Sequence, residues 1–277
     1  MKQLLKSVFM KVESPYGTNS TPTSADVILC ENVEINPLQM QTDDHAPVSN
    51  KFGQRDKIVG AMWCTVQFDV VTGAGGTPVG ALGGLPSYDS VLRAGCMARS
   101  ITPGTRIIYS PIDSGEESAT IRYHVDTAQF VLLGVRGELE WIFEAGKATR
   151  MRFTGIGLRQ PMTDAASGAY TLPTRPRPLA MNNANTLVRL NEIFSLRVQQ
   201  MNIKLGNKVE YVNRSSQEEI ILTDRVSSGG ITFELPSVAE QNFLGASGLC
   251  TLATQTSLWI AMSVGQPEGN RIGWYMP

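Results

Sequence analysis

The stretch GVRGELEWIFEAGKATRMRFTG, Gly134 to Gly155, alternates apolar and charged side chains along two neighbouring runs. The first run places Leu139, Trp141 and Phe143 on one face of an extended chain. Its opposite face carries charges of both signs, at Arg136, Glu138 and Glu140. Because successive strand side chains point to opposite faces, the pattern predicts strands with one face in a core and one toward water.

The same period of two recurs along most of the chain, with turn-forming residues about every ten residues, so the sequence predicts a mainly β protein. Short helices are expected over Tyr88–Met97 and Val238–Leu244, each after a Pro-Ser pair. The predicted strands are Met62–Val71, Arg106–Ser110, Ala119–Val125, Val131–Phe143, Thr149–Leu158, Val198–Leu205, Glu219–Asp224, Gly230–Leu235, Ser257–Val264 and Arg271–Met276.

Composition excludes several classes of function. The chain has 277 residues, 42% of them hydrophobic, which is enough for a sizeable core. Its net charge of −1 provides no basic field for tight nucleic-acid binding. No signal peptide or run of roughly 20 apolar residues is found, so synthesis in the cytoplasm is expected. The four cysteines have no metal-site spacing and are expected to be buried thiols.

The order of elements repeats on either side of a Pro- and Asn-rich segment, residues 159–186. Each half has a long polar stretch, a strand, a Pro-Ser helix start and a closing pair of strands. We therefore predict two tandem β-domains, residues 1–158 and a shorter 187–277, joined by this linker.

No catalytic, cofactor-binding or metal-binding residue is predicted. The Gly-rich loop Gly73–Gly84 lacks the Lys-Ser/Thr and the helix start of a phosphate loop. His124 and Asp126 could serve a hydrolase, but no nucleophile elbow accompanies them. Asp43, Asp44 and His45 are adjacent on one stretch and are read as a solvated or partner-contacting loop, not a metal site.

The ordered set of motifs resembles the tail tube (major tail) proteins of bacteriophages with long non-contractile tails. The similarity covers about four fifths of the chain, and the short C-terminal end after Trp274 departs from the family pattern. The motifs are KVESPYGTNSTPTSADVILCENVEINPLQMQ, MWCTVQFDVVTGAGGTP, LPSYDSVLRAGCMA, YSPIDSGEESATIRYHVD, LLGVRGELEWIFEAGKATRMRFTGIG and MNIKLGNKVEYVNRSSQEEIILTDRVSSGGITFELPSVA.

The resemblance implies a structural, non-enzymatic virion protein. Its subunits would form stacked rings whose sheets join into a continuous barrel, the conduit through which the genome is delivered. The charged strand face would line the lumen, and net acidity there would let DNA pass without specific binding. The acidic lumen candidates are Asp69, Glu138, Glu140 and Glu234, with Arg136, Arg150 and Arg152 pairing with them or facing neighbours.

Two polar stretches, Gln41–Lys57 and Asn207–Asp224, are candidates for contacts between rings by analogy with the family's long loops. Duplication would make a trimeric ring with pseudo-sixfold symmetry. The expected partners are tail terminator, tape measure and tail-tip proteins. The alternatives are another tail or neck structural protein, such as a terminator or a contractile-type inner tube protein, and, less favoured, a hydrolase or a carbohydrate-binding β-sandwich. The inter-ring candidates are Asp43, Asp44, Lys51, Arg55, Asp56, Lys208 and Arg214.

Overall fold

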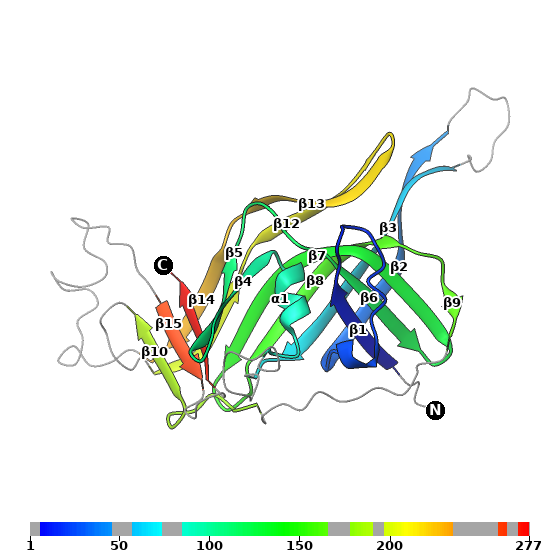
Figure 1. Cartoon of the computed structure of the whole chain (residues 1–277). Helices are drawn as coiled ribbons and strands as arrows, with labels where there is room; N and C mark the ends of the chain where they lie inside the picture. Colours follow the sequence, from blue (N-terminus) through cyan, green and yellow to red (C-terminus); the bar gives the residue numbers. More distant parts are fainter. Residues whose placement is uncertain are drawn as a thin grey trace, which may run out of the picture.

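The computed structural model describes residues 6–45, 57–73, 85–165, 178–190, 197–234, 260–264 and 271–276. Over these residues the chain is mainly β, with several sheets and a single short α-helix (Figure 1). The predicted fold class is confirmed, and the arrangement is compatible with a β-sandwich.

The largest sheet has nine antiparallel strands, six of which follow the order β1-β6-β7-β8-β3-β2. Of the other three strands, β9 and β11 pair with β7, and β14 pairs with β11. Strands from both predicted halves therefore share one sheet. The strands are β1 (Lys6–Val12), β2 (Cys30–Asp44), β3 (Lys57–Val71), β6 (Ala119–Val125), β7 (Ala128–Glu144), β8 (Arg150–Arg159), β9 (Thr163–Asp164), β11 (Val198–Lys204) and β14 (Ser228–Phe233).

Strand β7 organises this sheet. It pairs along one edge with β8, and along the other with β6 in its first part and β11 in its second. Leu139, Trp141 and Phe143 are buried as the alternation predicted, and Glu138 and Glu140 on the other face are half-buried. The buried side chains join those of β3 and β8 in one hydrophobic core.

Smaller sheets complete the molecule. A β4–β5 hairpin lies beside α1, a β12–β13 hairpin projects from the main sheet, and β10, β15 and β16 form a three-stranded sheet (Figure 1). The last of these contacts the core through Trp274, whose ring packs edge-on against Phe143. The strands are β4 (Met97–Thr102), β5 (Arg106–Pro111), β10 (Thr186–Leu190), β12 (Asn207–Arg214), β13 (Gln217–Arg225), β15 (Ile260–Val264) and β16 (Ile272–Met276).

The first predicted helix is shorter than expected. Helix α1 covers Asp89–Ala94 and stops at Gly95, and Met97 already belongs to β4. A side chain at Gly95 would overlap Leu139, so the turn lies close against the core. The second predicted helix, Val238–Leu244, lies outside the described residues. A three-residue 3-10 helix over Ser24–Asp26 was not predicted.

Six strands were also missed: β1, β2, β4, β9, β10 and β12. In β2 the ladder to β3 is broken by three register shifts, one beside Pro37, and these obscure the alternation on which the prediction relied. Among the described parts of the linker, residues 163–164 form β9 and Ala180 and Met181 make isolated bridges. No described helix is long and apolar enough to cross a membrane. The division into two tandem domains stays a prediction.

Candidate functional site: a charged sheet face and two projecting hairpins

The polar face of the main sheet carries a row of charges that crosses five strands. Glu31 of β2 lies opposite Asp69 of β3, and Asp69 lies opposite Arg152 of β8. Arg152 in turn lies opposite Glu140 of β7, which lies opposite Lys204 of β11. Residues directly opposite one another on antiparallel strands share a face, so this row belongs to one surface.

Ion pairs join the charges of this row. Arg152 Nε lies 2.9 Å from Asp69 Oδ1, and its Nη1 lies 3.9 Å from Glu140 Oε2. In the next row, Arg150 Nε lies 3.2 Å from Glu31 Oε2. Both arginines therefore have their charge balanced by carboxylates of the same sheet face.

Asp69 is the most buried member of the row, with 4% of its surface exposed. Burial alone raises the pKa of its carboxyl, but hydrogen bonds from Arg152 and from Asn32, together with the positive charge of Arg152, outweigh burial. The pKa of Asp69 consequently lies below its usual value, and the group is ionised at neutral pH.

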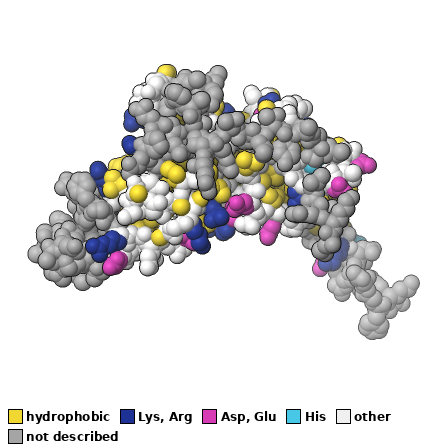
Figure 2. Space-filling view, turned by 90° about the horizontal axis from the view of Figure 1, so that it is seen from below, with side chains coloured by type: hydrophobic (Ala, Val, Ile, Leu, Met, Phe, Trp, Pro, Cys, Tyr) yellow, Lys and Arg dark blue, Asp and Glu magenta, His cyan; other side chains and the backbone are white. Residues whose placement is uncertain are grey.

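The remaining predicted lumen residues occupy different surroundings. Glu138 is half-buried, and Glu234 is exposed beyond the end of β14, 3.5 Å from Arg197. Figure 2, which views the molecule from below, shows acidic and basic side chains lying next to one another. Whether the four predicted acidic residues line a lumen stays a prediction.

Arg136 belongs to a different environment from Arg150 and Arg152. It is 9% exposed and lies beneath the β12–β13 hairpin, where it donates to the Ile220 carbonyl at 2.6 Å and the Glu116 carbonyl at 2.8 Å. Its guanidinium also stands 4.8 Å from the centre of the Tyr16 ring. This arginine holds the hairpin against the sheet.

The β2–β3 hairpin extends beyond the sheet. Its last pair with β8 is Trp63 with Leu158, yet the ladder between β2 and β3 continues as far as Asp44 and Lys57. Those two ends carry an exposed ion pair at 3.7 Å. Large apolar side chains are exposed along this hairpin, namely Leu38, Met40, Ile58, Val59 and Met62.

The β12–β13 hairpin projects toward the same end of the molecule (Figure 1). Its surface carries charges of both signs, paired at 2.8 Å between Lys208 and Glu210 and at 3.5 Å between Arg214 and Glu219. Tyr211 stacks on Trp63 of β3 with ring centroids 5.2 Å apart, so the two hairpins touch.

The described residues of both stretches predicted as inter-ring contacts thus belong to arms of hairpins or directly follow one. Asp43 and Asp44 end β2 and are exposed, Lys208 lies near the base of β12 and Arg214 near its tip. Lys51, Arg55 and Asp56 lie outside the described residues. Their role in assembly stays a prediction.

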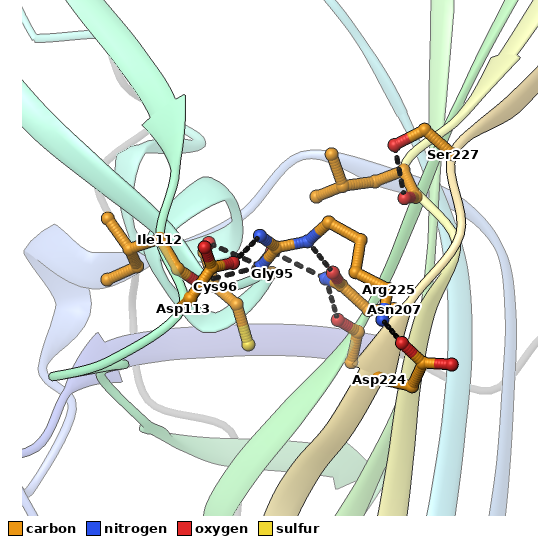
Figure 3. Close-up of polar contacts among 10 residues, drawn as sticks. Gly95, Cys96, Ile112, Asp113, Asn207, Asp224, Arg225 and Ser227 are labelled. Carbon is orange, nitrogen blue, oxygen red and sulfur yellow. Dashed lines mark hydrogen bonds and ion pairs between the residues drawn. The ribbon is translucent and has the colours of Figure 1, made fainter.

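A polar cluster fixes the base of the β12–β13 hairpin (Figure 3). Asn207 is 6% exposed and donates from its amide nitrogen to the Gly95 carbonyl at 2.8 Å and the Gly137 carbonyl at 3.1 Å. Its amide oxygen accepts a bond of 2.7 Å from Arg225 Nε. Two of these bonds reach distant parts of the chain, Gly95 at the end of α1 and Gly137 in β7, and the third joins the two strands of the hairpin.

Sequence reasoning missed Glu31, Lys204, Asn207 and Arg225. Lys204 follows Asn202 by two residues in QQMNIK, so the alternation in β11 could have placed it on the polar face. The roles of Asn207 and Arg225 depend on backbone carbonyls of the distant segments around Gly95 and Ile112, and no local pattern encodes such contacts.

His124 belongs to no cluster of metal-binding side chains in the part of the chain that the structure describes. His124 is 5% exposed and packs edge-on against Phe9, and Asp126 follows it in the β6–β7 turn. Among the described residues, no group of three or more histidine, cysteine or acidic side chains could hold a metal ion.

Comparison with known families identifies the chain. The sequence model of the family described as phage tail tube protein matches residues 4–257. Comparison with curated proteins gives no match. The match covers nearly the whole chain, including both hairpins and every strand of the main sheet, and the chain belongs to the phage tail tube family.

Proposed function

We propose that this protein assembles into stacked rings that form the tail tube of a phage, the conduit for genome delivery, and that the tail is of the long non-contractile type. The observation that carries the proposal is the family match over residues 4–257, on a fold whose main sheet has a packed face and a charged face. In this role the protein is a structural component of the virion, without catalytic activity, assembled in the host cytoplasm.

The charged face of β3, β7, β8 and β11 would line the lumen. Phosphate contacts from Lys and Arg accumulate into strong, salt-sensitive binding, which would hold a moving DNA. The pairing of Arg150 with Glu31, and of Arg152 with Asp69 and Glu140, supports a wall that offers few free cations. DNA would then pass without specific binding.

This part of the proposal can be tested by releasing Arg152. The double variant Asp69→Asn, Glu140→Gln leaves its charge unpaired, and we expect assembled tubes of this variant to retain short duplex DNA at low salt. Wild-type tubes and the exposed-site variant Glu210→Gln should not. Equal, weak retention by all three would contradict the lumen assignment.

Two hairpins that project toward the same end of the molecule support contacts between rings. Exposed Met40, Ile58 and Met62 give the β2–β3 hairpin an apolar surface that burial against a second copy would stabilise. Each predicted half contains a long hairpin: β2 pairs with β3, and β11 and β12 pair in turn with β14 and β13. This similarity supports the tandem duplication. Three duplicated chains would then make a ring with pseudo-sixfold symmetry.

The first experiment is negative-stain electron microscopy of the purified protein across a concentration series. Rings or hollow tubes are expected, and end views should show three chains per ring. A persistent monomer at every concentration, also in the presence of the terminator, tape measure and tail-tip proteins of the same tail, would contradict the proposed function.

A further inference from the structure

The β12–β13 hairpin leaves the sheet at a joint whose geometry the chain fixes closely. Strand β11 pairs with β7 as far as Lys204, and the Leu205 N–H then donates to the Leu139 carbonyl. Gly206 follows with φ of +75°, and a side chain there would overlap the Val226 carbonyl. The Val226 N–H donates to the Gly206 carbonyl at 3.0 Å, which closes the joint.

Arg225, at the end of β13, fixes this joint with its side chain. Its guanidinium donates to four acceptors, Asn207 Oδ1 at 2.7 Å, Asp113 Oδ1 at 2.8 Å, and the carbonyls of Ile112 at 2.9 Å and Cys96 at 3.4 Å (Figure 3). The side chain is 13% exposed. A planar guanidinium that satisfies several carbonyls at once fixes orientation more firmly than a single ion pair does.

A second brace acts farther along the hairpin. The Ile220 N–H donates to the Tyr16 hydroxyl at 2.6 Å, and the Ile220 carbonyl accepts from Arg136. Tyr16 itself lies against Gly134, where any side chain would overlap its ring. The hairpin is therefore held at its base and in the middle, by residues from the N-terminal segment, the α1 turn and β7.

We propose that Arg225 and Asn207 are positioning residues that set the direction of the β12–β13 hairpin in the free subunit, before any second copy is bound. This deepens the proposed function and rests on it only where it concerns assembly. Binding by a pre-organised segment avoids the entropic cost of ordering that segment on contact. The hairpin then meets a second copy already in its docking position.

The test measures hairpin orientation in dilute, unassembled protein. Spin labels on Lys11→Cys, an exposed site on β1, and Ser215→Cys, at the hairpin tip, report the distance between hairpin and sheet. A chain without these two substitutions measures background labelling of the native cysteines. We expect one narrow distance distribution for this pair, and a distribution at least about twice as wide after Arg225→Met.

Two further variants make the result decisive. Arg214→Met, which removes an exposed charge on the same hairpin, should leave the distribution narrow. Arg225→Lys keeps a positive charge but loses the planar fork, so it should widen the distribution to an intermediate degree, and it replaces Arg225→Met if that variant fails to fold. Wild-type width in the Arg225 variant that folds would overturn the proposal.

Assembly provides the second readout. The Arg225 variant should raise the protein concentration needed for tube formation by about tenfold, because the freed hairpin must be ordered on docking. If the wild-type protein forms no tubes, the proposed function fails while the label distances still decide the role of Arg225. An unchanged assembly concentration, together with a widened distribution, would show that hairpin direction does not limit docking and would overturn its link to assembly.

Discussion

The two projecting hairpins point to the same end of the molecule but are attached to it in different ways. The β2–β3 hairpin continues the ladder of the main sheet, so the hydrogen bonds of the backbone carry it outward. The β12–β13 hairpin leaves the sheet at Gly206 and depends on a few buried side chains, above all Asn207 and Arg225. An attachment made by backbone hydrogen bonds tolerates most side-chain substitutions, whereas an attachment made by side chains depends on those particular residues.

Their surfaces differ as well. Exposed apolar side chains gather on the β2–β3 hairpin, while exposed ion pairs cover the β12–β13 hairpin. In the proposed tube, the first would contribute most of the buried area and the second would favour a particular orientation of the next ring.

The largest difference in stability is expected between alanine substitutions at one glycine of each hairpin. Gly206→Ala forces a side chain into a left-handed backbone and against the Val226 carbonyl, and should lower the free energy of unfolding by about 3 kcal/mol or more. At Gly60 the nearest atom to an added methyl group is the Gln41 carbonyl oxygen, at 3.6 Å, which is an ordinary contact. Gly60→Ala should therefore change stability by less than about 0.5 kcal/mol.

Chemical denaturation of both variants measures this contrast, with circular dichroism to confirm folding. Similar stability losses at the two positions would show that the joint at Gly206 is no more constrained than a continuous ladder. The proposed difference between the attachments of the two hairpins would then be wrong.

A pair of asparagines gives the next largest contrast. Asn207→Ala leaves the Gly95 and Gly137 carbonyls and Arg225 Nε without their partner, at a cost of about 2–3 kcal/mol. Asn36, in a bulge of β2, is exposed and bonds only locally to the Leu38 N–H, so Asn36→Ala should cost less than about 0.5 kcal/mol. Urea unfolding midpoints of the two variants measure these losses of stability. Equal losses would show that Asn207 does not fix the base of the β12–β13 hairpin.

The same contrast explains what the sequence could predict. Alternation located strands that lie in the core, such as β7 and β8. Burial alternates along β8 and along the second half of β7, from Glu138 to Glu144. The alternation also placed Asp69 and Glu140 on one face with Arg152, and these three do pair. The alternation of apolar and polar side chains depends only on neighbouring residues, so it can be recognised in a single sequence.

The parts that were missed depend on contacts between distant segments. Strand β2 was hidden by its bulges. Strand β12 was taken for a polar loop because its residues are mostly half-buried or exposed and show no alternation of buried and exposed positions. Arg225 could not be distinguished from other arginines, since three of its four acceptors, on Cys96, Ile112 and Asp113, lie more than a hundred residues earlier. Side chains that bind backbone carbonyls leave no complementary residue in the sequence.

A smaller effect is expected where the hairpins touch. Stacking of Trp63 on Tyr211 should contribute about 0.5–1.5 kcal/mol beyond the buried area. A double-mutant cycle with Trp63→Leu and Tyr211→Leu should return a coupling energy in that range. Tyr211 with Trp141, a core residue on the opposite face of the sheet, serves as the control cycle. Coupling near zero for the first pair would show that the hairpins move independently.

The smallest expected effect is a pH dependence of stability, which we assign to His124 in the main sheet and not to His45 beside the β2–β3 hairpin. Burial, and then the charge of Arg122, hold the pKa of His124 below its usual value of about 6.5. Below that pH the unfolded chain binds a proton that the folded chain does not, so stability should fall as pH drops from about 6.5 toward the folded pKa. His124→Gln should remove this dependence, while His45→Gln, at the exposed end of β2, should retain it. Unfolding midpoints between pH 7.5 and 5 measure the difference; if His45→Gln is the variant that flattens the profile, the acid-sensitive group lies on the β2–β3 hairpin instead of in the body.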